Sequence, residues 1–219
     1  MVDLGQKLAR LWVRLQPEKF YDQDYFLKDC GGWETFLKSG GKKLVKRFQV
    51  ALEMVEIKKG MKILDIGCGR GEVVSYYHQK GAKVIGLDFS QAAIKIAKKT
   101  YPEVSFIHQN VFQYQPETKF SLIMMLDFIE HIPKRKFKGL LRKCHHWLEK
   151  KGQILIHTNE KKQEEAPGVP FHSTHINLMT AQEVKNILNE HGFKIKKFIL
   201  RPRESEESSG GIYCLAQKG

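Results

Sequence analysis

Short apolar runs alternate with segments of helical periodicity from residue 61 to the end of the chain. These runs are rich in β-branched residues and mostly lack polar alternation, which is typical of strands covered by helices on both faces. A strand followed by a helix returns to a parallel neighbour by a right-handed crossover, so the pattern predicts an α/β fold built on one mainly parallel sheet. The seven predicted strands are residues 61–66, 83–87, 104–107, 120–125, 153–158, 194–200 and 211–216.

Capping signals predict where several helices begin and end. Thr180 and Glu183 have the spacing of a capping box, and Gly192 follows as a C-terminal stop. Ser90 predicts the start of another helix in the same way. A third helix is expected where apolar residues recur at helical spacing from Phe137 to Leu148.

Two segments fall outside this alternation. Residues 1–41 are rich in aromatic side chains and end in Ser39-Gly40-Gly41, so we expect an N-terminal helical cap followed by one catalytic domain over residues 42–219. Residues 159–179 form a polar connection of about twenty residues, which is longer than compact domains usually contain without a functional reason. This loop is predicted to border a substrate site.

The composition narrows the class of protein. No apolar run approaches the ~18 residues of a transmembrane helix, and basic residues interrupt the first sixteen positions where a secretory signal would be continuous. The 4 cysteines form no CxxC pair, so neither a disulfide framework nor a structural zinc site is indicated. A protein of the reducing cytoplasm is expected, and its oligomeric state stays open.

The first helix is predicted to be amphipathic. Apolar residues at positions 4, 8, 11, 12 and 15 form a stripe beside Lys7, Arg10 and Arg14. Such a helix can contact an anionic membrane or pack on the domain, and we expect packing.

The stretch from Ile63 to Glu72, ILDIGCGRGE, carries the most chemical information. Glycines 67, 69 and 71 follow a predicted strand, where they let the backbone approach a ligand closely. Asp88 ends the second predicted strand, where a carboxylate can accept both ribose hydroxyls of an adenosine. Together these features indicate a nucleoside-containing cofactor.

The spacing of the turn favours one cofactor over another. It reads GxGxG rather than GxGxxG, and Asp65 stands two residues before the first glycine. A carboxylate there would repel a dinucleotide's pyrophosphate but would suit the ammonium group of a methionine moiety. S-adenosylmethionine is therefore favoured over NAD.

With these motifs in order, residues 43–217 resemble the class I S-adenosylmethionine-dependent methyltransferases. The resemblance rests on LDIGCGRGE, GLDFS, HQNVF and LIMMLDFIEHIP. It implies a Rossmann-like, seven-stranded, mainly parallel sheet in the order 3-2-1-4-5-7-6, with strand seven antiparallel. It says little about the methyl acceptor.

The resemblance also implies roles for individual residues. Gly67, Cys68 and Gly69 would line the methionine end, and Asp88 would hold the ribose. Phe89, Asn110 and Val111 would surround the adenine, with Asn110 replacing the Asp of many relatives. Leu126 and Asp127 would border the sulfonium. Including Asp65, the predicted cofactor-binding residues are Asp65, Gly67, Cys68, Gly69, Asp88, Phe89, Asn110, Val111, Leu126 and Asp127.

The predicted chemistry is direct transfer of a methyl group, for which an alcohol acceptor needs a general base. His131 is the leading candidate by position, and His172 and His175 in the long loop are alternatives. Each of the three has a structural or solvent-exposed role as its alternative interpretation. Asp127, Asn159 and Glu160 could also form an oxygen-rich magnesium site, but we predict no metal.

Three functions compete at this point. We expect methylation of a small molecule, with a sugar or other hydroxyl-bearing metabolite preferred. An RNA or tRNA methyltransferase is the alternative, because the net charge is +13 and residues 134–151 hold eight basic residues against Glu149. A non-catalytic partner subunit that keeps the cofactor fold is disfavoured by the intact motifs.

Overall fold

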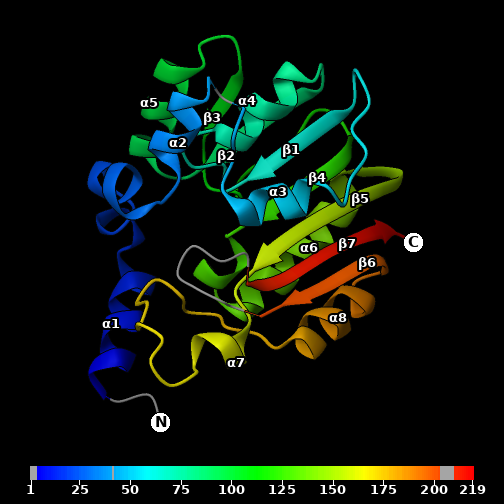
Figure 1. Ribbon diagram of the computed structural model, residues 1–219. Coiled ribbons are helices and arrows are strands. Elements are labelled where there is room, and N and C mark those ends of the chain that lie inside the picture. The colour runs from blue at the N-terminus through cyan, green and yellow to red at the C-terminus, as the bar shows by residue number, and fades with distance from the viewer. Residues whose placement is uncertain (1–3, 41, 203–209) are drawn as a thin grey trace.

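The computed structural model describes residues 4–40, 42–202 and 210–219 (Figure 1). Its seven strands form one sheet in the order β3-β2-β1-β4-β5-β7-β6. Strand β7 runs antiparallel to both β5 and β6, and the other pairings are parallel. The expected sheet order and orientation are confirmed. The strands are β1 (Lys62–Ile66), β2 (Lys83–Asp88), β3 (Ser105–His108), β4 (Phe120–Leu126), β5 (Leu148–Thr158), β6 (Phe193–Arg201) and β7 (Gly211–Lys218).

Helices cover both faces of the sheet, as predicted. Consecutive residues of β1 point to opposite faces of the sheet. Ile63 packs in the hydrophobic cluster that includes residues of α3, α4 and α5, and Leu64 packs in the cluster that includes residues of α6 and α8. Both side chains are fully buried. The helices of the core are α3 (Lys46–Leu52), α4 (Glu72–Gln79), α5 (Gln91–Thr100), α6 (Lys134–Trp147), α7 (Lys161–Glu164) and α8 (Ala181–Glu190), with a 3-10 turn η3 (Ile129–His131) after β4.

The predicted caps are present. Thr180 and Glu183 form the capping box of α8, and Gly192 follows that helix with a φ of 81°. Ser90 accepts a hydrogen bond from the Ala93 N–H at the start of α5. The predicted end of α6 is wrong by one residue, because Leu148 adopts an extended conformation and opens β5.

The N-terminal segment contains α1 (Leu4–Leu15), η1 (Pro17–Lys19), η2 (Tyr25–Asp29) and α2 (Trp33–Lys38). Our prediction that the stripe of α1 packs on the domain is wrong. Leu4 and Leu15 are 72% and 69% exposed, and Val13 is the buried residue of this helix. Val13 lies on the side of the helix opposite the stripe, so α1 packs on the rest of the protein through that side. Within the described residues, no helix combines the length and the apolarity that crossing a membrane would require.

Candidate active site

The glycine-rich turn lies between β1 and α4. Gly67, Gly69 and Gly71 have φ values of 76°, 52° and 85°, a region that side chains disfavour. A Cβ on Gly67 would lie 2.5 Å from the ring of Phe128, and one on Gly71 would lie 2.6 Å from Phe106. The turn therefore requires glycine for close packing as well as for backbone conformation.

Asp88 fixes this turn from the end of β2. Its Oδ2 accepts from the Gly69 N–H at 3.0 Å, and its Oδ1 accepts from the Ser90 N–H at 2.8 Å. Burial raises the pKa of Asp88, while these backbone donors oppose that rise. Each carboxylate oxygen retains a second lone pair, so the group that shapes the turn can also accept ribose hydroxyls.

The predicted adenine contacts lie beside Asp88. Phe89 is half-buried and meets the ring of Tyr21 edge-on, with a centroid separation of 5.5 Å. The Asn110 amide oxygen already accepts the Phe112 N–H at 3.0 Å, so a contact with an adenine amino group would use its other lone pair. Val111 is buried next to it.

Asp65 differs from the other predicted cofactor residues because it does not line the cavity at this turn. Its carboxyl is 3% exposed, and burial followed by repulsion from Asp88 raises its pKa to about 7. A cation brought near this group would lower that pKa. The structure thus places Asp65 behind the turn rather than on its surface.

Asp127 directly follows β4 in a left-handed conformation, with a φ of 49°. Its Oδ2 accepts from Arg47 Nε at 2.5 Å, and its Oδ1 contacts His157 Nδ1. Burial alone would raise the pKa of Asp127, but Arg47 and His157 hold it well below its usual range. Both oxygens of Asp127 thus have charged or polar partners. The Glu160 carboxylate caps α7 through the Gln163 N–H.

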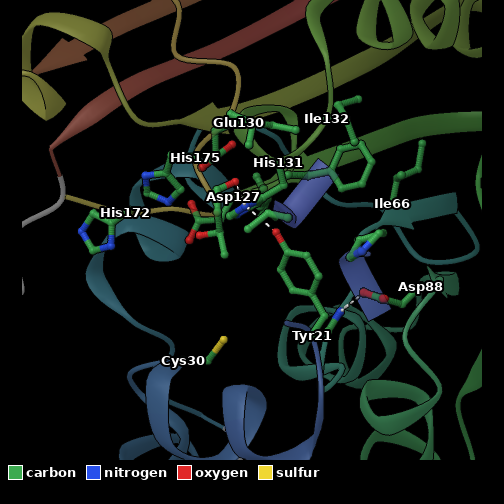
Figure 2. Close-up of a pocket in the computed structure, with 18 of the residues that line it drawn as sticks. Tyr21, Cys30, Ile66, Asp88, Asp127, Glu130, His131, Ile132, His172 and His175 are labelled. Atoms are coloured by element: carbon green, nitrogen blue, oxygen red, sulfur yellow. Dashed lines mark hydrogen bonds between the residues drawn. The ribbon is translucent and has the colours of Figure 1, made fainter. Parts of the chain in front are cut away.

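His131 lies in η3, just after β4. Its Nδ1 is 2.9 Å from the Tyr21 hydroxyl and 3.1 Å from the Thr174 carbonyl oxygen (Figure 2). Burial, with a further contribution from His175, lowers the pKa of His131 to about 4, so the ring is neutral at pH 7. The carbonyl only accepts, so a neutral ring carries its hydrogen on Nδ1 and its lone pair on Nε2.

The long loop brings the other two predicted histidines to the same place. The His175 ring lies 5.2 Å from that of His131 and 4.8 Å from that of His172, centroid to centroid. Glu130 anchors this part of the loop, because its backbone carbonyl accepts from the Ile176 and Asn177 N–H groups. Ligand atoms of Glu130, His131 and His175 lie within 4.8 Å of one another, although Nδ1 of His131 already contacts Thr174 and Nδ1 of His175 contacts Glu164.

Glu130 is also notable for one unsatisfied atom. It is fully buried, and its Oε2 accepts from the Thr158 hydroxyl at 2.9 Å. Within the described part of the chain, Oε1 has no hydrogen-bond partner. Burial and then Asp127 raise the pKa of this carboxyl. Such an atom calls for a partner from a bound molecule or water.

Arg70, inside the glycine-rich turn, joins the turn to the N-terminal segment. Its guanidinium donates to the carbonyl oxygens of Phe26 at 2.5 Å, Cys30 at 2.9 Å and Gly31 at 3.3 Å. It also pairs with Glu72 at 2.6 Å and is almost fully buried. This single side chain therefore links the cap to the predicted cofactor site.

All these elements border one cavity of about 1070 Å³ (Figure 2). Tyr21, Tyr25 and Phe26 border it from the N-terminal segment, and the 159–179 loop borders it as well. Of the predicted site residues, those that line it are Gly67, Cys68, Gly69, Asp88, Phe89, Asn110, Val111, Leu126, Asp127, His131, His172 and His175.

Comparison with known proteins defines the class. The chain belongs to the family described as methyltransferase domains, whose model matches residues 39–197. The chain is therefore a methyltransferase, and its identification with the class I S-adenosylmethionine-dependent enzymes is confirmed, with S-adenosylmethionine as methyl donor.

Two individual relatives share moderate sequence identity with the chain. The chain is 28% identical over 192 residues to phosphoethanolamine N-methyltransferase of Plasmodium falciparum, covering 82% of this chain and 70% of that protein. It is 30% identical over 105 residues to ubiquinone biosynthesis O-methyltransferase of Pseudomonas aeruginosa, covering 45% of this chain and 44% of that protein. The chain thus spans less than half the length of that second relative.

Solved structures share the fold. Magnesium protoporphyrin IX methyltransferase of Synechocystis, with bound S-adenosylmethionine, aligns with a TM-score of 0.64 at 17% identity and covers 90% of this chain and 95% of that one. An S-adenosylmethionine-dependent methyltransferase of Mesorhizobium loti aligns with a TM-score of 0.66 at 18% identity, covering 78% and 97%.

Four site residues escaped the sequence interpretation. Arg47 and His157 hold Asp127, Arg70 holds the cap, and Glu130 has one buried carboxylate oxygen without a partner among the described residues. His157 sits in an apolar strand, where a lone polar residue could have been noticed. Arg47 lies far from Asp127 in sequence, and no local pattern connects the two.

Proposed function

We propose that this methyltransferase acts on a small hydroxyl-bearing molecule, such as a sugar, with His131 as general base. The observation that carries the proposal is that a half-buried, neutral histidine lines the same cavity as the glycine-rich turn and Asp88. A base that is unprotonated at pH 7 can take the acceptor's proton as the methyl group is transferred.

The cofactor fits the residues present. Gly67 and Gly69 offer a backbone surface without side chains, and Asp88 lies within reach of the same cavity. When bound, S-adenosylmethionine supplies an already activated methyl group, so the protein has to orient the acceptor and exclude water. We assign the ribose to Asp88 and the methionine end to the turn.

The acceptor side is assigned to the N-terminal segment and the 159–179 loop. Tyr21 positions His131 through its hydroxyl, and the Nε2 of that ring is the proton-accepting atom. The unpaired Oε1 of Glu130 suits a hydrogen-bond donor on the acceptor, which a hydroxyl or an amine supplies. The relatives include both N- and O-methyltransferases, so an assay must identify the methylated atom.

The RNA alternative has less support. The cap and loop residues border the cavity on the acceptor side, which suits a small molecule better than a polynucleotide. Two basic residues of α6 are also paired, Lys134 with Glu183 and Lys138 with Glu190.

A cytoplasmic location remains our proposal, supported by 4 free cysteines of which Cys68, Cys144 and Cys214 are buried.

The test is a donor-consumption assay over sugars, other alcohols, phenols, amines and tRNA, followed by product identification. With the preferred acceptor, His131→Ala should lower turnover by about 10²- to 10⁴-fold while S-adenosylhomocysteine affinity stays within a few-fold. His146→Ala, an exposed histidine of α6, is the matched control. Full turnover in His131→Ala would remove the base assignment, and activity on tRNA alone would replace the proposed acceptor class.

A further inference from the structure

Helix α1 presents an apolar face that no described residue covers. Its stripe residues are between 46% and 72% exposed, and they lie on one side of the helix: Leu4, Leu8, Leu11, Trp12 and Leu15. Val13, on the opposite side, is buried against the body. The side of α1 that carries Val13 therefore packs on the rest of the protein, and the larger apolar side is exposed to solvent.

The charges on this helix are all of one sign. Lys7, Arg10 and Arg14 follow one flank of the stripe, and α1 contains no acidic residue. The Arg10 guanidinium lies 5.0 Å from the centre of the Phe171 ring, which is 38% exposed. Phe171 from the 159–179 loop is thus a further exposed apolar side chain, beside the basic flank of α1.

This surface adjoins the mouth of the active-site cavity. Leu11, Arg14 and Leu15 border the cavity, as do Pro170 and His172 on either side of Phe171 in the sequence. Figure 1 shows α1 at the edge of the molecule, beside the loop that precedes α8.

We propose that α1 and Phe171 bind an anionic lipid surface, with the mouth of the cavity facing the headgroups. Apolar side chains flanked by basic residues are the combination that binds such interfaces, where leucine and tryptophan enter the boundary and lysine and arginine meet the headgroups. A second copy of this chain is a poorer occupant, because it would bring the same basic flank and a net charge of +13 against each other.

Vesicle flotation tests this binding independently of any methyl transfer. The protein is mixed with vesicles of phosphatidylcholine alone or of phosphatidylcholine with phosphatidylglycerol, at low and at high salt. We expect recovery only with the anionic vesicles, weaker at high salt, together with a blue shift of the tryptophan fluorescence that Trp12→Ser removes.

Two variants locate the binding surface. Leu8→Ser/Trp12→Ser changes two residues outside the cavity lining and should weaken vesicle binding by about tenfold or more. Leu37→Ser/Leu200→Ser removes two exposed leucines elsewhere and should leave binding unchanged. Calorimetry with S-adenosylhomocysteine checks that both variants remain folded.

Three results overturn the proposal. One is no recovery of the wild-type protein with anionic vesicles. Another is equal recovery of the wild type and Leu8→Ser/Trp12→Ser. The third is a dimer without lipid, measured by light scattering, that dissociates in this variant, which would make a second copy the occupant.

Discussion

Replacing Arg70 by alanine should release the N-terminal segment from the core. The change removes three hydrogen bonds to backbone carbonyls of residues 26, 30 and 31, and it leaves Glu72 without its ion-pair partner. Hydrogen bonds from a charged group contribute about 1.5–3 kcal/mol each, and removing one partner of a buried pair costs about 3–5 kcal/mol. These contributions overlap, so we expect Arg70→Ala to cost about 3–5 kcal/mol of stability in all.

Because the lost contacts hold one segment, the cost should appear as local opening. Amide exchange in residues 20–36 should accelerate by about 10²- to 4 × 10³-fold, since each 1.4 kcal/mol is a factor of ten. The sheet strands should exchange at nearly their original rates. Hydrogen exchange read by mass spectrometry gives both quantities in one experiment.

Two variants separate the roles of the guanidinium. Arg70→Lys keeps the charge but not the planar fork that reaches several carbonyls, so it should give intermediate exchange. Glu72→Gln removes the ion pair and leaves the carbonyl contacts, so the segment should stay protected. Unchanged exchange of residues 20–36 in Arg70→Ala, or an equal rise throughout the protein, would refute this account of the cap.

Three further predictions follow from the site. The pKa of His131 is 6.5 in the unfolded chain and about 4 in the folded protein. Its contribution to the free energy of unfolding is therefore constant above pH 6.5 and falls by about 3 kcal/mol as the pH drops to 4. Urea unfolding of the wild type and His131→Gln at pH 7.5 and 4.5 tests this, and a stability difference that does not change with pH contradicts it. Asp88→Ala should weaken S-adenosylhomocysteine binding by about 10- to 150-fold in calorimetry, through loss of charged hydrogen bonds, and unchanged affinity would exclude the ribose role. Gly67→Ala should cost about 1–3 kcal/mol of stability in thermal unfolding because its Cβ meets Phe128; Gly60→Ala, with a φ of 80° and open space, measures the backbone cost alone, and equal losses would argue against the clash.

Much of the fold could be predicted because its signals are local. Most strands contain a short apolar run, such as residues 122–126 of β4, and the capping box of α8 involves Thr180 and Glu183, three residues apart. The glycine turn was equally visible, since positive φ values restrict the residue type at Gly67 and Gly69. The sheet order came from the family resemblance, because strand periodicity does not specify neighbours.

The site could be predicted only in part because its geometry depends on distant contacts. Residues 127 and 157 meet through the pairing of β4 with β5, and residue 47 reaches Asp127 from α3. Nothing in their sequence spacing indicates an ion-pair cluster. The exposure of α1 was misjudged for a related reason. An amphipathic stripe predicts that a helix binds something apolar, but not whether that surface belongs to its own domain.

The position of β7 inside the sheet has a consequence for the order of folding. Strand β6 pairs with β7, which also pairs with β5 on its other side, so β6 joins the sheet only after a strand that follows it in sequence. The pairing of β7 with β5 joins segments far apart in the sequence and is therefore slow to form. Until it forms, the edge of β5 is open to pairing with other chains. Tyr213 of β7 lies 4.5 Å from the ring of His157, centroid to centroid, and His157 contacts Asp127. Pairing of β7 with β5 therefore completes the support of the active site, so partly folded chains expose the edge of β5 before the site is complete.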